Sequence, residues 1–357
     1  MNFVCTRCGR KEAVTTRAAH CPCGGLWKLE ADLPAFDLSG VDPHEWSLFR
    51  YRKFMALEDE SWRAVTMGEG MTPVVRLDED VLLKMDYFMP TLSFKDRGAA
   101  VLIAHCKSIG VDQVVQDSSG NAGNAVAAYC ARSGIGCEIF VPEGTSPKKI
   151  DMIRAHGAVC TVVPGTRDHC ADVCREKVER EGVYYANHVY NPFFYEGTKT
   201  YIYEVFEQLG RIPANLVIPV GNGTLFLGAM YALEHLFNSG VIDRFPQIIA
   251  LQSQNCDPLL RAAEHGKTEP EAVMPAPTIA EGIAIGKPMR GREILTLAEK
   301  HGVHFIHAPE EQILSARATL AKKGIYCEHT TAANYAAYLE YCRVYGKTSD
   351  TLITMCG

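Results

Sequence analysis

Lys95 is the residue whose type and surroundings point most directly to chemistry. It lies in the run Pro-Thr-Leu-Ser-Phe-Lys-Asp-Arg-Gly, residues 90–98, between a strand-like segment and an apolar helical one. At the start of a helix the dipole disfavours an ammonium ion. Partial burial there favours the neutral amine, which attacks carbonyl groups and forms Schiff bases. The alternative interpretation is an exposed lysine paired with Asp96.

Two glycine-containing loops have the composition of anion-binding sites. The first follows a predicted strand and opens a helix, so its hydroxyls, amides and carboxamide suit a carboxylate. It is also explained as an ordinary helix start capped by Ser or Asn. The second also opens a helix and suits a phosphate, although it lacks the spacing of a dinucleotide fingerprint or a P-loop. The first loop comprises Ser118, Ser119, Gly120 and Asn121, and the second comprises Gly221, Asn222, Gly223 and Thr224.

The amine, the carboxylate cradle and the phosphate loop together suit one cofactor. Each lies at a predicted strand-to-helix junction, and parallel sheets bind ligands beyond the carboxyl ends of their strands. Pyridoxal 5'-phosphate (PLP) has an aldehyde, an aromatic ring and one phosphate, so it would use all three.

Four cysteines near the N-terminus have the spacing of a metal site. A Cys-x-x-Cys pair and a Cys-x-Cys pair are separated by twelve residues. This arrangement favours a structural Zn²⁺ ion, because a ribbon this small cannot build a core without a metal. The short second pair leaves open that His20 replaces one thiolate, and unligated surface cysteines are the alternative. The predicted ligands are Cys5, Cys8, Cys21 and Cys23.

The composition limits the class of protein. The chain has 357 residues, of which 47% are hydrophobic and 22% charged, as in a soluble protein of about two domains. Its net charge of −6 argues against nucleic acid or an anionic membrane as a partner. We see no secretory signal and no apolar run that could cross a bilayer, so we expect a cytoplasmic protein. The other cysteines are scattered, and few or no disulfides are expected.

From about residue 78 onward, strand and helix patterns alternate, which predicts an α/β fold with parallel sheets covered by helices on both faces. The predicted strands are 81–85, 113–117, 137–141, 160–163, 216–220, 248–252 and 352–355. The predicted helices are 99–109, 122–132, 147–156, 171–181, 195–209 and 225–238.

Taken together, these motifs resemble those of fold-type II PLP enzymes, and most of all threonine synthases. Those enzymes carry Pro-Thr-Gly-Ser-Phe-Lys-Asp-Arg-Gly around their lysine, a Ser-Ser-Gly-Asn loop and a glycine-rich phosphate loop. Several of them also begin with a cysteine ribbon. The resemblance implies that Lys95 forms the Schiff base with PLP and that Asn121 hydrogen-bonds its ring hydroxyl. It assigns the substrate carboxylate to residues 118–120 and the cofactor phosphate to residues 221–224.

A residue in the turn after the last strand contacts the pyridine nitrogen in this family. Here the candidates are Cys356 and Thr354. A thiol or hydroxyl there would leave the nitrogen unprotonated, which suits elimination and replacement more than transamination. The sequence stops directly after this motif, so we expect that a short tail is missing.

Several positions depart from the threonine synthase pattern. The family motif has an arginine near position 194. Without it, a phosphorylated substrate loses a bidentate contact. The histidine at 188 either compensates in part or marks a different leaving group. The departures are Leu92 for Gly, Ala122 for Thr, His188 for Ser, Phe194 for Arg and Thr198 for Gln.

The segment Thr278–Ala284 is closer to serine and threonine dehydratases than to threonine synthases. Its Glu281 is a candidate for substrate or cofactor contacts, and a helix-start carboxylate is the alternative. A second candidate segment for substrate contacts is Glu328–Thr331, which capping of the following helix explains almost as well.

The sequence therefore predicts a PLP-dependent lyase that eliminates or replaces a group on a small α-amino acid. The closest family reaction converts O-phosphohomoserine to threonine and phosphate. The alternative is a β-eliminating or β-replacing relative that acts on serine, phosphoserine or a similar substrate. A rival of another class is a zinc-ribbon interaction protein on a non-catalytic body. We expect a homodimer.

Four segments make up the predicted domain organisation. Residues 1–30 form a zinc ribbon, and 31–90 form a linker and the start of the large domain. Residues 91–195 form a smaller mobile α/β domain with the Schiff-base lysine, and 196–357 form the large domain with the phosphate loop.

Overall fold

The computed structural model describes all of residues 1–357, and the chain divides into two compact units. Unit 1 comprises Met1–Gly70 and Met89–Thr198, and unit 2 comprises Met71–Phe88 and Lys199–Gly357. The chain therefore passes between the units at residues 70/71, 88/89 and 198/199. The last of these passages lies within a single helix, α5 (Phe193–Leu209).

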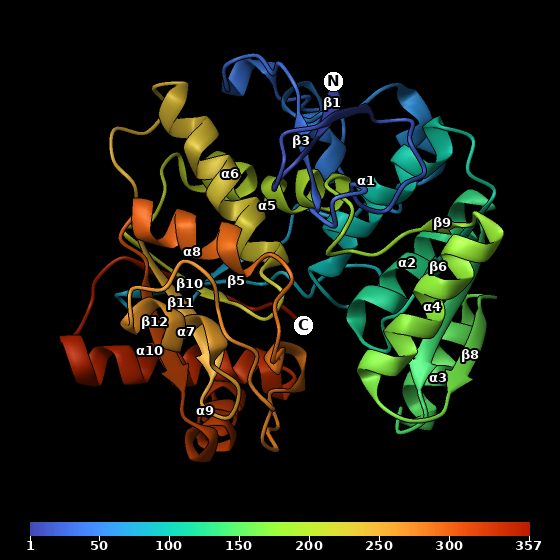
Figure 1. Ribbon diagram of the computed structural model, residues 1–357. Coiled ribbons are helices and arrows are strands. Elements are labelled where there is room, and N and C mark those ends of the chain that lie inside the picture. The colour runs from blue at the N-terminus through green and yellow to red at the C-terminus, as the bar shows by residue number, and fades with distance from the viewer. The chain divides into compact units, whose positions relative to one another are not determined.

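Unit 1 contains a four-stranded sheet in the order β8-β7-β6-β9, with every pair of neighbours parallel. Helices α2, α3 and α4 lie around this sheet (Figure 1). Because the strands are parallel, the loops that follow them emerge at one edge of the sheet. The strands are β6 (Gln113–Gln116), β7 (Gly136–Pro142), β8 (Val159–Val163) and β9 (Tyr184–Tyr185), and the helices are α2 (Asn121–Ser133), α3 (Pro147–Ala155) and α4 (Arg167–Glu181).

The N-terminal part of unit 1 is a small ribbon followed by three short 3₁₀ helices. The ribbon is an antiparallel sheet in the order β2-β1-β3, with strands of only three or four residues. Each 3₁₀ helix has an N-cap residue whose side chain accepts a hydrogen bond from a backbone N–H. The N-caps are Asp37, Ser47 and Asp59, and the donors are the N–H groups of Ser39, Phe49 and Ser61 respectively. The elements are β1 (Asn2–Cys5), β2 (Lys11–Ala13), β3 (Trp27–Glu30), η1 (Leu38–Gly40), η2 (Leu48–Phe54) and η3 (Glu60–Ala64).

Helix α1 (Lys95–Ser108) packs against α2 and η3, and it approaches the first turns of α5 closely. A Cβ on Gly197 would lie 1.9 Å from the backbone oxygen of Arg97. A Cβ on Gly98 would lie 2.3 Å from the ring of Phe194. Side chains at these two glycines would therefore separate the helices.

Unit 2 contains a six-stranded sheet in the order β12-β11-β10-β13-β5-β4, parallel except for β4 against β5. Helices α6 and α8 lie on one face and α9 and α10 on the other (Figure 1). Leu83, Ile249 and Ile353 of the sheet share a buried cluster with Ala336 of α10. The strands are β4 (Val74–Arg76), β5 (Val81–Lys84), β10 (Asn215–Pro219), β11 (Gln247–Ser253), β12 (His304–Ala308) and β13 (Thr351–Thr354). The helices are α6 (Thr224–Asn238), α7 (Pro258–Glu264), η4 (Glu281–Ile283), α8 (Gly291–Lys300), α9 (Glu310–Lys322) and α10 (His329–Tyr345).

The structure confirms the predicted α/β fold. All seven predicted strands and all six predicted helices are present, with ends displaced by at most four residues. Helices α1 and α4 each begin four residues earlier than predicted, because polar residues occupy their first turns. Strands β9 and β12 and helices α7, α8 and α9 were not predicted, and neither was the antiparallel strand β4.

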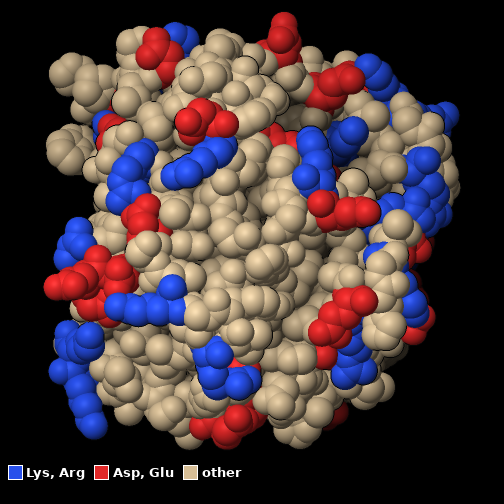
Figure 2. Space-filling model, turned by 90° about the vertical axis from the view of Figure 1, so that its left-hand side faces the viewer, with Lys and Arg blue, Asp and Glu red and all other residues tan.

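The surface carries charges of both signs. Basic and acidic side chains lie interspersed on the face drawn in Figure 2, around an area of uncharged residues. No helix combines the length and the apolar character that crossing a bilayer requires. The longest helices, α5 and α10, have 17 residues each.

Candidate active site and metal centre

Lys95 is the first residue of α1 and is partly buried. Its backbone N–H donates to the hydroxyl of the buried Ser93 over 3.2 Å, and its Nζ lies 4.2 Å from the centre of the Phe94 ring. Asp96 is fully buried, and its carboxylate accepts hydrogen bonds from the backbone N–H and the hydroxyl of Thr91. This burial rules out the exposed Lys95–Asp96 pair. Asp96 instead fixes the loop that leads into α1.

The loop Ser118–Asn121 joins β6 to α2 at the carboxyl edge of the unit 1 sheet. Its tight turn requires Gly123, where a Cβ would lie 1.8 Å from the backbone oxygen of Ser118. Gly120 is the N-cap of α2, so no N-cap side chain closes this helix start. A Cβ on Gly120 would meet no atom within 4 Å. The first N–H groups of α2 therefore begin beside open space, as an anion site requires.

His188 lies in the loop after β9, and β9 is paired with β6, so its loop and Ser118–Asn121 leave neighbouring strands. The imidazole is 7% exposed, and its Nδ1 has no hydrogen-bond partner. Burial, together with the charges of Lys95 and Arg167, holds the pKa of His188 well below its usual 6.5. The structure therefore places a neutral imidazole with an unpaired nitrogen within electrostatic reach of Lys95.

Side chains from neighbouring strands hold the backbone on both sides of His188. The carboxylate of Asp117, at the end of β6, accepts hydrogen bonds from the Tyr185 hydroxyl over 2.6 Å and from Asn187 Nδ2 over 2.7 Å. Asn187 Oδ1 in turn accepts from the N–H of Val189 over 2.8 Å. Asp117, Tyr185 and Asn187 were not singled out from the sequence, because the contacts of Asp117 with the other two join residues about 70 positions apart.

In unit 2, the loop Gly221–Thr224 joins β10 to α6. Gly223 has a positive φ of 78°, and a Cβ there would lie 2.4 Å from Ile294 Cδ1. Thr224 is the first residue of α6 and is 2% exposed. The N-cap of this 15-residue helix is a glycine, so its N–H groups can bind a phosphate.

Cys356 follows β13, which runs parallel to β10, so Cys356 and the Gly221–Thr224 loop leave the same edge of the unit 2 sheet. Its Sγ lies 3.4 Å from the Thr331 hydroxyl and 3.7 Å from Asn334 Nδ2, both on α10. The hydroxyl of Thr354 lies 2.8 Å from that of Tyr201. Thr331 lay within a segment expected to contact substrate, whereas Asn334 was missed, although an i, i+3 pair of polar residues on one helix was a visible signal.

Glu281 is the first residue of the short helix η4 and is exposed. The N–H of the next residue, Gly282, donates to the Thr330 hydroxyl at the start of α10 over 3.1 Å. This contact ties the segment Thr278–Ala284 to α10, within the same unit as the phosphate loop.

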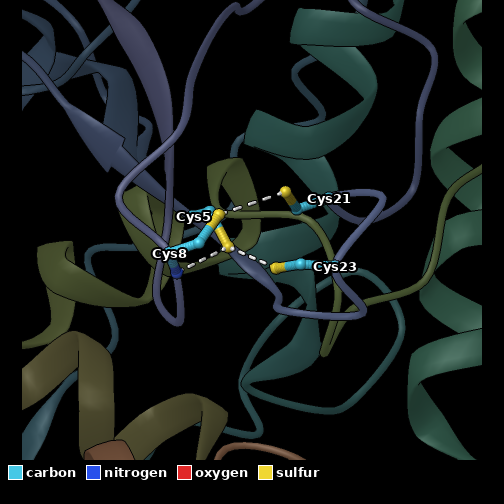
Figure 3. A group of neighbouring side chains, drawn as sticks. All are labelled: Cys5, Cys8, Cys21 and Cys23. Atoms are coloured by element: carbon cyan, nitrogen blue, oxygen red, sulfur yellow. Dashed lines mark hydrogen bonds between the residues drawn. The ribbon is translucent and has the colours of Figure 1, made fainter.

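The four N-terminal cysteines form one cluster. Figure 3 shows their side chains turned toward one another, and all four Sγ atoms lie within 4.8 Å of each other. Cys5 and Cys23 Sγ are 3.4 Å apart, and Cys8 and Cys21 Sγ are 3.6 Å apart. A tetrahedral site with metal–sulfur bonds of about 2.3 Å needs spacings of this size. His20 is not part of the cluster, and its Nδ1 lies 3.0 Å from the carbonyl oxygen of Cys21.

The surroundings of the thiols also suit a cation. Burial opposes ionisation of Cys5, but the backbone N–H groups of Cys8 and Arg7 outweigh it and lower its pKa to about 6. The N–H of Cys23 favours the Cys21 thiolate, but burial and the other three thiols outweigh it and raise that pKa to about 12. Crowded thiolates repel one another, so a bound metal cation is what would allow all four to ionise.

Comparison with known proteins identifies the family. Residues 65–357 match the family model described as pyridoxal-phosphate dependent enzyme. The chain belongs to this family. It is 29% identical to the threonine synthase of Methanocaldococcus jannaschii over 347 residues, which cover 93% of this chain and 85% of that protein. It is 30% identical to the threonine synthase of Mycobacterium leprae over 299 residues, which cover 81% of each chain.

A solved structure of this PLP-dependent family shows the same fold. The processed form of threonine deaminase isoform 2 from Solanum lycopersicum superposes with a TM-score of 0.71 at 22% identity, covering 93% of this chain and 95% of that one. Together these comparisons confirm the predicted fold-type II architecture, PLP as the cofactor and the relationship to threonine synthases. The chain is thus a PLP-dependent enzyme of the lyase type.

The residues present fit the cofactor of this family. Unit 1 supplies a partly buried amine at Lys95 and an unpaired buried nitrogen at His188. Unit 2 supplies a glycine-lined helix start at Gly221–Thr224, with Cys356 at the same sheet edge. These are the groups that a phosphorylated aldehyde and an amino acid require.

Proposed function

We propose that this enzyme eliminates or replaces a group on a small α-amino acid, with Lys95 as the residue that binds the cofactor and transfers the proton. The place of Lys95, partly buried at the first position of α1, carries this proposal, together with the electrostatic effect of its charge on the pKa of the buried His188. Bound PLP supplies an electron sink for negative charge at the substrate Cα. The Lys95 amine then takes the α-proton and later returns a proton to the product.

The loops orient the substrate and the cofactor in this proposal. Ser118, Ser119 and Gly120 hold the substrate carboxylate at the start of α2, where the dipole favours an anion. Asn121 contacts the ring hydroxyl of the cofactor, and Gly221–Thr224 hold its phosphate. Cys356 is the first candidate for the partner of the ring nitrogen, because it lies in the turn after β13. Thr354, whose hydroxyl lies 2.8 Å from that of Tyr201, is the second candidate. Glu281 stays a candidate for substrate contacts.

Threonine formation from O-phosphohomoserine is the first substrate proposal, because the relatives named above are threonine synthases. A second proposal is β-elimination or β-replacement on serine, phosphoserine or a similar substrate. Within this set, His188 and Phe194 favour the substrates without a phosphate. The neutral imidazole and the fully buried phenyl ring supply no cation for a phosphate. A hydrogen bond from a neutral imidazole suits an uncharged hydroxyl better.

A substrate screen distinguishes the two reactions. PLP-loaded enzyme is mixed with O-phosphohomoserine, serine, threonine and phosphoserine, and phosphate, threonine and keto acids are measured. Threonine and phosphate from O-phosphohomoserine support the first proposal, and keto acid or a β-substituted product supports the second. Lys95→Ala is the control that should lose the visible absorbance of the bound cofactor and all turnover. If no substrate changes that absorbance or gives product, both proposals fail.

We also propose that Cys5, Cys8, Cys21 and Cys23 bind structural Zn²⁺. Four thiolate ligands leave no open position for catalysis. Metal analysis of the purified enzyme tests the metal, and Cys8→Ser should lower the metal content. If Cys8→Ser abolished binding to a protein partner while folding and cofactor loading survived, the ribbon would be an interaction module.

The wider setting of the enzyme belongs to the same proposal. We infer a cytoplasmic homodimer that binds neither nucleic acid nor membranes, with residues 91–195 as the smaller domain that carries the lysine. The interspersed charges in Figure 2 support the absence of a nucleic-acid or membrane partner, and the uncharged area there supports an interface between copies. Sedimentation at several concentrations tests the dimer.

A further inference from the structure

The metal ribbon packs on the segment that carries His188. Leu26, which directly precedes β3, belongs to the same buried cluster as Val189 and Tyr190. Phe3 of β1 lies edge-on to Phe193, with ring centres 5.9 Å apart. The ribbon therefore contacts the two residues directly after His188 and the first residue of α5.

This contact is closely packed. Phe3 and Trp27 are 2% and 1% exposed, and the Trp27 indole N–H donates to the carbonyl of Ala18 over 2.9 Å. One void between the ribbon and residues 184–192 has a volume of about 10 Å³, close to what a single water needs, and is lined by Phe3, Trp27 and Tyr190 among others. The same buried cluster continues into the strands of the unit 1 sheet through Val115 and Phe140. The ribbon thus completes the core of unit 1 on this side.

The loop of His188 is consequently held from two directions. The hydrogen bonds of Asp117 and Asn187 fix it to the end of β6. The apolar ribbon contacts fix Val189 and Tyr190. The Tyr195 hydroxyl adds a hydrogen bond to the carbonyl of Val189 over 2.9 Å.

We propose that the metal-bound ribbon is a positioning element for the substrate site, which holds Val189 and Tyr190 and through them orients His188. This inference rests on the substrate role proposed above for His188. Strands of three or four residues cannot form a stable sheet alone, so the shape of Leu26 and Phe3 as a packing surface depends on the metal. Loss of the metal therefore removes one wall of the His188 loop. The ribbon contacts α1 through Phe3 and His105, ten residues beyond Lys95.

Hydrogen exchange measured by mass spectrometry tests the positioning directly. PLP-loaded enzyme is compared with the Cys8→Ser variant and with enzyme stripped of metal by a chelator. The expected result is exchange in residues 184–191 that is faster by about tenfold or more, while α6 and the phosphate loop in unit 2 keep their protection. Unchanged exchange in residues 184–191 after metal loss would overturn the proposal.

Leu26→Ala gives a milder test, because it trims the contact and keeps all four thiols. Its matched control is Lys28→Ala, on β3 with an exposed side chain. We expect Leu26→Ala to retain metal and cofactor absorbance and to raise KM by about tenfold, with a smaller change in kcat. Lys28→Ala should change neither. A rise in exchange at residues 184–191 without any change in KM would leave the packing role intact and refute the substrate role of His188.

Discussion

The ring of Phe194 lies against the backbone of Gly98, one turn beyond Lys95 in α1. A Cβ on Gly98 would lie 2.3 Å from Phe194 Cδ1 and Cε1. Phe194 is fully buried, and its ring centre is 5.7 Å from that of His188. The residue that replaces the expected arginine therefore supports the helix of the lysine and the imidazole beside it. It offers no polar group to a substrate.

Gly98→Ala should disturb this contact. A methyl group at 2.3 Å forces the Phe194 ring or α1 to move, and overpacking of this kind costs about 1–3 kcal/mol of unfolding free energy. Urea unfolding measures the loss. Gly144→Ala is the control, because a Cβ there meets no atom within 4 Å. Equal stability of the two variants would show that the ring yields without cost.

Leu92 adopts a backbone conformation that suits glycine. Its φ is 61°, and its side chain is 69% exposed, so little packing compensates for the strain. Leu92→Gly should raise the unfolding free energy by about 0.5–1 kcal/mol, since relief of the left-handed strain exceeds the entropy cost of glycine. Leu92→Ala keeps the strain and should give no gain. A gain in both variants would assign the effect to the exposed side chain.

His188→Phe separates stability from function. An apolar ring removes a buried nitrogen that lacks a partner, so stability near neutral pH should stay equal or rise by about 1 kcal/mol. Because folding depresses the pKa of His188, the wild type should lose stability as pH falls below 6.5, and the variant should lose less. KM for the amino acid should rise by about tenfold if the imidazole contacts the substrate. Thermal unfolding across pH and steady-state kinetics provide both measurements.

Glu69 predicts a pH dependence of the opposite sign. Its buried carboxylate accepts hydrogen bonds from Met67 N–H over 2.8 Å and from the Tyr129 hydroxyl over 3.1 Å. Burial nevertheless raises its pKa from 4.5 to about 7. The contribution of Glu69 to the unfolding free energy is therefore fully present below pH 4.5 and is lost as pH rises through about 7.

Glu69→Gln should remove this pH-dependent loss of unfolding free energy. The loss amounts to about 1.4 kcal/mol for each unit by which folding raises the pKa of Glu69. Urea unfolding at several pH values between those limits measures the slope. The exposed Glu60→Gln variant serves as the control and should follow the wild type. A slope that Glu69→Gln leaves unchanged would place the titrating group elsewhere.

Local patterns explain what the sequence predicted well. Lys95 at a helix start and the glycine-containing loops after β6 and β10 are set by neighbours in the chain, so strand, loop and helix could be read in order. The cysteine spacing likewise predicted the four-thiol cluster. Long-range contacts explain what was missed. The unpaired nitrogen of His188 has no local signature, and the polar pair Thr331 and Asn334 on α10 does not by itself reveal that both side chains contact Cys356.

No local feature marks the passages between the two units. The passage from unit 1 to unit 2 at residue 198 lies inside the uninterrupted helix α5, where no proline, glycine-rich stretch or change of composition marks it. Residues 71–88 belong with a sheet whose other strands begin more than a hundred positions later.

The position of β13 in its sheet has a consequence for how the chain folds during synthesis on the ribosome. This strand, residues 351–354, lies between β10 and β5 in the middle of the unit 2 sheet. Unit 1, in contrast, has its last strand by residue 185. During synthesis at about 5–20 residues per second, unit 1 can fold many seconds before unit 2 receives its central strand. Until then the facing edges of β10 and β5 have no partner strand, so the nascent chain needs shielding there until residues 351–354 emerge.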